Sequence, residues 1–173
     1  MIQPVRMYIG HGASGSAATM EPFAAGLRAR GVDAIAIDLP RRRAEDAVPA
    51  LLATAPPDGH VVIGGQSFGG RVASLAAAGR RYRGLVCFCY PLHRPGHPDP
   101  LTRVAHWPDI ACPTLLLSGE SDPFARIDLL RAAMPGLPNG ELVTFPGLGH
   151  SLRPVLDVVL DRVAAFVLAL PDP

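Results

Sequence analysis

Short runs of apolar residues recur along the chain, and most of them end in a glycine-rich or polar turn. These runs cover residues 5–9, 32–37, 60–63, 84–89, 114–117 and 142–145. Apolar runs of this length without polar alternation are typical of strands that are buried on both faces of a sheet. The pattern therefore predicts about six strands.

Longer segments with apolar residues at helical spacing lie between these runs. Thr19 can cap a first helix, and further helices are predicted over residues 44–53, 70–78, 124–134 and 154–168. The inward stripe of the last helix is expected to consist of Leu156, Val159, Val163 and Phe166. Residues 90–111 are proline-rich and irregular. Because a helix must return the chain between parallel strands, we expect an α/β fold: a three-layer α/β/α sandwich with a mostly parallel sheet, in one domain over residues 1–173.

The composition narrows the class of protein. Hydrophobic residues make up 49% of the chain and charged residues 18%, which is enough apolar material for one core. Sixteen basic against fifteen acidic residues give a net charge of +1, so nucleic-acid binding is not expected. No apolar run approaches the roughly 20 residues of a membrane span, and the N-terminus resembles no leader, which predicts a cytoplasmic protein. A monomer or homodimer is expected.

Two groups of potential metal ligands are interpreted as structural. Cys87 and Cys89 lie two residues apart in an apolar strand, so they are expected on one face of it as small buried hydrophobes. The irregular segment carries three histidines and an acidic residue without zinc-like spacing, namely His93, His97, His106 and Asp99. We therefore predict no metal site and no cofactor.

A glycine-serine turn is the strongest sign of chemistry. The run Gly65-Gln66-Ser67-Phe68-Gly69 joins the end of a predicted strand to the start of a predicted helix. A G-x-S-x-G pattern in this position is typical of a nucleophile elbow, in which a sharp turn exposes the serine hydroxyl. The other interpretation is an ordinary glycine turn. The position favours Ser67 as a nucleophile.

A serine nucleophile needs a base and a carboxylate that orients the base. In this type of fold they follow the serine in the order acid, then histidine. Two acids, Glu120 and Asp122, follow the strand over 114–117, and we prefer Asp122, which could otherwise serve only as a helix cap. His150 lies in the glycine-rich loop after the last strand and is the expected base.

Further residues at the same edge are candidates for binding roles. The backbone amides of Ala13 and Phe68 are the expected oxyanion donors. The candidates for substrate contact are His11, Gly12, Tyr90 and His93, although His11 is better explained as a residue that holds its loop by hydrogen bonding. The run 41–43 consists of three arginines, which could meet an anionic substrate group but are better explained as a solvated patch.

Three stretches carry a resemblance to a known family. They are residues 64–73 around the elbow, the run Tyr90-Pro91-Leu92-His93-Arg94-Pro95-Gly96, and residues 113–124 around the acid. The chain resembles the small α/β-hydrolase-like proteins that include testis-expressed protein thirty and a domain of the third regulatory subunit of the NSL complex, relatives of the dienelactone hydrolases. The resemblance implies a minimal α/β-hydrolase fold without a cap domain, an open site, and a triad at Ser67, Asp122 and His150.

The motifs and the resemblance together predict a serine hydrolase of small ester or thioester substrates, acting through an acyl-enzyme. Dienelactone hydrolases use a cysteine where this chain has Ser67, so that particular activity is not predicted. The alternative is a catalytically idle module of the same fold that serves in binding or as a scaffold.

Overall fold

The computed structural model describes residues 5–99 and 101–172. The strands are β1 (Arg6–Gly10), β2 (Asp33–Ile37), β3 (Val61–Gln66), β4 (Gly84–Phe88), β5 (Thr114–Gly119) and β6 (Gly140–Phe145). The helices are α1 (Ala17–Arg28), α2 (Ala44–Thr54), α3 (Phe68–Ala77), α4 (Leu101–Val104), α5 (Ile127–Ala133) and α6 (Leu156–Leu168). Short 3-10 turns cover Trp107–Asp109, Met134–Gly136 and Arg153–Val155.

In the described part of the chain, the strands form one six-stranded sheet in the order β2-β1-β3-β4-β5-β6. Every neighbouring pair is parallel. The chain moves from β1 outward to β2 and then returns to place β3 on the other side of β1. The direction of winding therefore reverses between β1 and β3, and such switch points open a crevice at the carboxyl ends of the strands.

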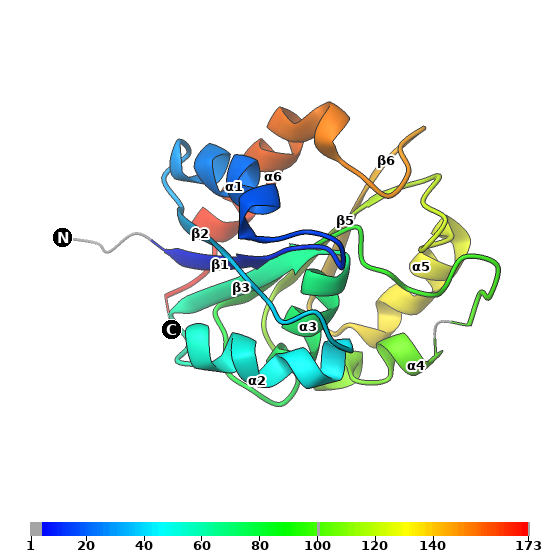
Figure 1. Cartoon of the computed structure of the whole chain (residues 1–173), viewed down its shortest axis with the longest axis horizontal. Coiled ribbons are helices and arrows are strands. Elements are labelled where there is room, and N and C mark those ends of the chain that lie inside the picture. Colours follow the sequence, from blue (N-terminus) through cyan, green and yellow to red (C-terminus); the bar gives the residue numbers. More distant parts are fainter. Residues whose placement is uncertain (1–4, 100, 173) are drawn as a thin grey trace.

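Helices cover both faces of the sheet (Figure 1). Helices α1 and α6 lie on one face, while α2 and α3 lie on the other. The core is divided accordingly into two apolar clusters, one containing Ile63 and Leu116 and the other containing Val62 and Leu117. Neighbouring strand residues belong to opposite clusters because successive side chains of a strand point to opposite faces. The predicted three-layer α/β/α sandwich is confirmed.

Some predicted details are wrong at the level of single residues. Helix α1 begins at Ala17 with Ser16 as its N-cap, and Thr19 lies inside the helix, where its Oγ1 accepts a hydrogen bond from the Ser16 amide at 3.3 Å. In α6 the predicted residue Phe166 is only half-buried, whereas Val167 is buried. All four predicted residues still contact the core, with Val159 and Val163 buried and Leu156 and Phe166 packed against it, and the inward face also includes Leu160, Ala164 and Val167.

Cys87 and Cys89 do not share a face of the sheet. Cys87 packs in the cluster beneath α2 and α3, and Cys89 packs in the cluster beneath α1 and α6. Strand β4 ends at Phe88, and Cys89 has a φ of 51°, which interrupts the alternation of side chains. The prediction of one shared face assumed a regular strand through residue 89 and is wrong for that reason.

Over the ranges described, each helix is too short or too polar to span a lipid bilayer. They also form no separate cap domain over the carboxyl edge of the sheet.

Candidate active site

Ser67 lies in the turn between β3 and α3, at the carboxyl edge of the sheet. Its backbone has φ 49° and ψ −112°, a conformation that is strained for a residue with a side chain. Two hydrogen bonds hold the turn: the Ser67 amide donates to the Phe88 carbonyl at 2.8 Å, and the Gly69 amide donates to the His11 carbonyl at 3.0 Å. The turn is thereby fixed to the ends of β4 and β1.

Glycines allow the sharp turn because the chain passes very close to itself. A Cβ added to Gly65 would lie 2.7 Å from the Gly10 carbonyl oxygen and 2.6 Å from the Gly69 carbonyl carbon. A Cβ added to Gly69 would lie 2.5 Å from the Gly10 carbonyl carbon. These atoms belong to the backbone and cannot move aside easily. The absence of side chains at Gly65 and Gly69 therefore lets α3 start directly against β1.

His150 connects Ser67 to Asp122. The ring Nδ1 lies 2.7 Å from the Asp122 carboxylate, and Nε2 lies 2.8 Å from the Ser67 hydroxyl oxygen. A carboxylate only accepts hydrogen bonds, so Nδ1 donates, and Nε2 of the neutral ring can then accept the Ser67 proton. The structure thus brings together three side chains that lie 83 and 28 residues apart in sequence.

The two acids of the loop after β5 have different surroundings. The Asp122 side chain is fully buried, with one oxygen facing His150 and the other accepting the Phe124 amide at 2.8 Å. Glu120 instead accepts hydrogen bonds from Thr144 at 2.7 Å and Arg131 at 3.2 Å. Of the two acids, only Asp122 contacts His150. The hydrogen bond from the Phe124 amide fixes the Asp122 carboxylate. It does not cap α5, because that helix begins only at residue 127.

The loops after β5 and β6 are pressed against one another. A Cβ on Gly119 would lie 2.2 Å from the Leu148 carbonyl oxygen, and the Ser121 amide donates to that same carbonyl at 2.9 Å. This close backbone contact brings the acid loop and the histidine loop to one place. The Phe124 ring completes the arrangement, with its centroid 4.3 Å from that of His150.

Two backbone amides near Ser67 are candidates for binding an oxyanion, those of Phe68 and Ala13. Phe68 is the first residue of α3, so its amide has no intrahelical acceptor. Ala13 lies in the exposed loop after β1, where the Gly15 amide closes a turn onto the Gly12 carbonyl at 2.9 Å. These are the amides expected from the sequence to bind an oxyanion.

His11 and His93 are both buried, with 2% exposure each. Both nitrogens of each ring form a hydrogen bond within the protein. The Leu39 amide donates to His11 Nε2, and the Arg126 amide donates to His93 Nε2, each at 3.0 Å. In each ring Nδ1 therefore carries the proton and donates to the next residue's carbonyl, at 2.8 Å for His11 and 2.9 Å for His93. Both histidines fix loops around the site.

Tyr90 is also buried, and its hydroxyl donates to the Arg103 carbonyl at 2.5 Å. Burial raises its pKa to about 12. Because the side chains of Tyr90, His11 and His93 are withdrawn from solvent, we do not propose direct substrate contacts for them. Gly12 is half-buried in the open loop after β1 and keeps its place as a candidate.

Among the described residues, one group of potential metal ligands comes together: Cys89, Asp122 and His150, whose ligand atoms all lie within 4.8 Å of one another. The sequence did not predict this position for Cys89, because it depends on the break in β4. Burial raises the pKa of the Cys89 thiol to about 12, so the sulfur stays protonated and is a poor metal ligand. The other two members of the group, Asp122 and His150, lie close together because they share a hydrogen bond.

Comparisons with solved structures show the same fold. The chain is similar to a ferulic acid-bound Est1E from Butyrivibrio proteoclasticus, with 17% identity, a TM-score of 0.79 and coverage of 97% of this chain and 89% of that one. It is similar to a monoacylglycerol lipase from Paleococcus ferrophilus, with 13% identity, a TM-score of 0.76 and coverage of 94% and 96%. It is also similar to a dienelactone hydrolase from Anabaena variabilis, with 22% identity, a TM-score of 0.74 and coverage of 96% and 87%.

The search of curated proteins finds no match to this sequence. A family model of the alpha/beta hydrolase domain, in contrast, matches residues 5–158. This match spans the five crossovers from β1 to β6 and the start of α6, and it includes Ser67, Asp122 and His150. With the fold and the family model in agreement, the chain belongs to the alpha/beta hydrolase domain family.

Proposed function

We propose that this protein is a serine hydrolase that cleaves small esters or thioesters through an acyl-enzyme. The observation that carries the proposal is the continuous chain of hydrogen bonds from Ser67 through His150 to Asp122, at 2.8 and 2.7 Å. A serine hydroxyl is a weak nucleophile by itself and becomes effective when an oriented base takes its proton. The strained turn at Ser67 holds the hydroxyl toward that base.

In the first half of the reaction, Ser67 Oγ forms a bond to the acyl carbon while His150 Nε2 takes the hydroxyl proton. The carbonyl oxygen becomes an oxyanion, which the amides of Phe68 and Ala13 would stabilise. The bond from carbon to the leaving oxygen or sulfur then breaks, and His150 returns its proton to the leaving group. Asp122 remains ionised and stabilises the imidazolium that forms in between.

In the second half, water attacks the acyl-enzyme while His150 takes one of its protons. The bond between carbon and Ser67 Oγ breaks, and His150 returns this proton to Ser67. The products are a carboxylic acid and an alcohol or thiol. These steps use only side chains and backbone amides of this chain and a water molecule.

Labelling with a fluorophosphonate probe tests the nucleophile. The wild-type protein should be labelled at Ser67, and Ser67→Ala should abolish labelling. Ser121→Ala is the matched control, because Ser121 is exposed and lies in the neighbouring acid loop. Labelling that persists in a folded Ser67→Ala variant would overturn the assignment. A well-folded wild type that is never labelled would instead favour the idle binding module.

The pH dependence of hydrolysis tests the base. The kcat/KM for a p-nitrophenyl ester should fall when the pH is made acidic enough to protonate His150, because only the neutral ring can accept the Ser67 proton. His150→Gln should lower kcat/KM by about 10³-fold or more. A flat pH profile in the wild type would argue against His150 as the base.

A further inference from the structure

A pocket of about 450 Å³ lies beside the start of α3, separate from the hydrogen-bonded chain of Ser67, His150 and Asp122. It is bounded by the starts of α2 and α3, by the loop after β4 and by α4. Four of its lining residues are arginines, namely Arg43, Arg71, Arg94 and Arg103, and two are acidic, namely Glu45 and Asp99. The pocket is thus lined by more cations than anions.

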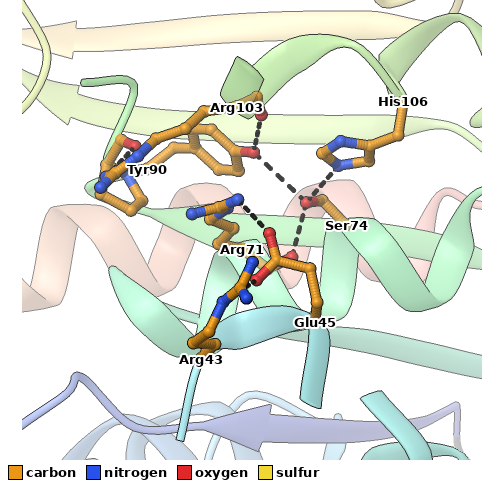
Figure 2. Close-up of polar contacts among 8 residues, drawn as sticks. Arg43, Glu45, Arg71, Ser74, Tyr90, Arg103 and His106 are labelled. Atoms are coloured by element: carbon orange, nitrogen blue, oxygen red, sulfur yellow. Dashed lines mark hydrogen bonds and ion pairs between the residues drawn. The ribbon is translucent and has the colours of Figure 1, made fainter. Parts of the chain in front are cut away.

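The acidic residues neutralise only part of this charge. Glu45 lies between two of the arginines (Figure 2), at 2.5 Å from Arg71 and 3.8 Å from Arg43. Within the ranges that the structure describes, neither Arg94 nor Arg103 forms an ion pair. Arg103 donates only to the Pro91 carbonyl, at 2.9 Å. Two guanidinium groups of the pocket, those of Arg94 and Arg103, therefore have no ion-pair partner among the described residues, although the charge of Glu45 acts on Arg103.

The arginines also oppose one another. The pKa of Arg103 is lowered first by burial and then by the neighbouring charges of Arg71 and Arg94. Arg71 Nε is buried and has no hydrogen-bond partner among the described residues. A buried donor without a partner and a group of crowded like charges both cost free energy. An anion bound in the pocket would relieve the crowding of like charges.

Two residues that line the pocket, Arg71 and Arg94, lie close to the candidate active site along the chain. The Arg71 amide donates to the Ser67 carbonyl at 3.0 Å, so the two residues lie one helical turn apart, roughly 6 Å along α3. On the other side, Arg94 follows His93, whose amide donates to the Phe124 carbonyl at 3.0 Å. Phe124 in turn packs against His150. A substrate bound at Ser67 could therefore extend a charged end into this pocket.

We propose that the pocket binds an anionic group, a carboxylate or a phosphate, carried by the ester or thioester substrate. This proposal rests on the proposed hydrolase function. Guanidinium groups suit both anions, because their N–H donors match a pair of oxygens. The arginine run at 41–43 is divided accordingly: Arg43 lines the pocket, whereas Arg41 and Arg42 are exposed outside it.

Two pairs of substrates test the proposal. The first pair is a p-nitrophenyl ester of glutaric acid with a free carboxylate and the same ester capped with a methyl group. The second pair is an acetyl thioester of a phosphorylated thiol and its dephosphorylated form. The wild type should prefer the anionic member of at least one pair in kcat/KM by about 10-fold or more, and the pair that shows it identifies the side of the scissile bond, acyl or leaving group, from which the anion reaches the pocket.

Arg94→Gln should lower this preference by about 5- to 20-fold, because it removes an exposed cation that pairs with no acidic group in the described part of the chain. Arg42→Gln is the matched control: it makes the same change in net charge outside the pocket and should leave the preference unchanged. Equal kcat/KM values within both pairs for the wild type, or an equal loss of preference in both variants, would overturn the anion site and leave the hydrolase function intact.

If the wild type hydrolyses neither member of either pair, this result counts against the proposed hydrolase function and does not test the anion site. The anion site is then decided by calorimetric titration of the wild type and Arg94→Gln with glutarate and with inorganic phosphate. Affinity that falls about 5- to 20-fold in Arg94→Gln but not in Arg42→Gln supports the site. Equal affinities in all three proteins, or no measurable binding to the wild type, would overturn it.

Discussion

Ser67 has a backbone conformation that few residues with a side chain adopt, and its neighbours make that conformation possible. The chain can turn so sharply only if β3 and α3 approach β1 at backbone contact, which excludes a Cβ at Gly65 and Gly69. The strain at one residue is thus offset by close packing at two others. Together these residues fix the direction of the Ser67 hydroxyl toward His150.

The substitution Gly65→Ala should destabilise the protein by about 3 kcal/mol, because the new methyl group would lie 2.6 to 2.7 Å from backbone atoms of Gly69 and Gly10. It should also reduce probe labelling of Ser67 in the folded fraction. Urea unfolding measures the change in the free energy of unfolding. Gly136→Ala is the control, since no atom lies within 4 Å of its added Cβ, and its effect should stay below about 1 kcal/mol. Equal destabilisation by both variants would contradict the packing argument.

Residues of the candidate site differ in how far the sequence could predict their positions. Ser67 lies in a local motif whose strand and helix are both visible in the pattern, and His150 and Asp122 follow later strands in the expected order. Cys89 was misplaced because its φ of 51° has no sequence signal. The ring contact of Phe124 with His150 depends on how two loops meet in space, which no local pattern encodes.

At the scale of elements, a polar network attaches the segment after β4 to helix α3 (Figure 2). Ser74 of α3 lies 2.8 Å from His106 Nε2 and 3.5 Å from the Tyr90 hydroxyl. The Tyr90 ring also packs edge-on against Trp107 at 5.2 Å. The sequence predicted only an irregular proline-rich stretch here, because the hydrogen-bond partners of this segment lie on another element. These contacts of Ser74, Tyr90 and Trp107 explain how the segment after β4, which has little regular structure, can form one wall of the pocket lined by Arg71, Arg94 and Arg103.

His106 should make the stability of this attachment depend on pH. Burial, followed by the charge of Arg71, lowers the His106 pKa from 6.5 to about 4, so the folded state favours the neutral ring. The unfolded chain binds a proton more readily, so this contribution to stability is present above about pH 6.5 and is lost as the pH falls toward 4. Between pH 7 and pH 5 the wild type should lose about 1 kcal/mol more than His106→Gln, after allowance for partial exposure of the ring.

Denaturant unfolding at the two pH values measures this difference. His60→Gln is the matched control, because His60 is exposed at the opposite end of β3. It should lose the same stability as the wild type over this range. If His106→Gln and the wild type lose equal stability between pH 7 and pH 5, the buried neutral His106 is not a source of the pH dependence.

At the scale of the whole molecule, the sheet was the most predictable feature. Its strands are nearly continuous apolar runs because helices cover both faces, and this pattern is visible in sequence. The order of the strands is less visible, since nothing local states that β3 returns to the far side of β1. That reversal places the loop after β1 beside Ser67 and so creates the crevice in which the candidate site lies. The extent of the domain over residues 1–173 stays a prediction.

The openness of this crevice leads to a prediction about acyl-chain length. Ala13 is exposed, and Ser67 and His150 are half-buried, with 23% of the His150 side chain exposed; the described residues form no cap above them. An enclosed acyl pocket gains about 0.8 kcal/mol for each buried methylene, so six added methylenes would raise kcat/KM more than 10³-fold. In an open site those methylenes stay in water. We therefore expect kcat/KM for p-nitrophenyl esters to change by less than about 10-fold from acetate to octanoate, whereas a rise of about 10³-fold would reveal an enclosed acyl pocket.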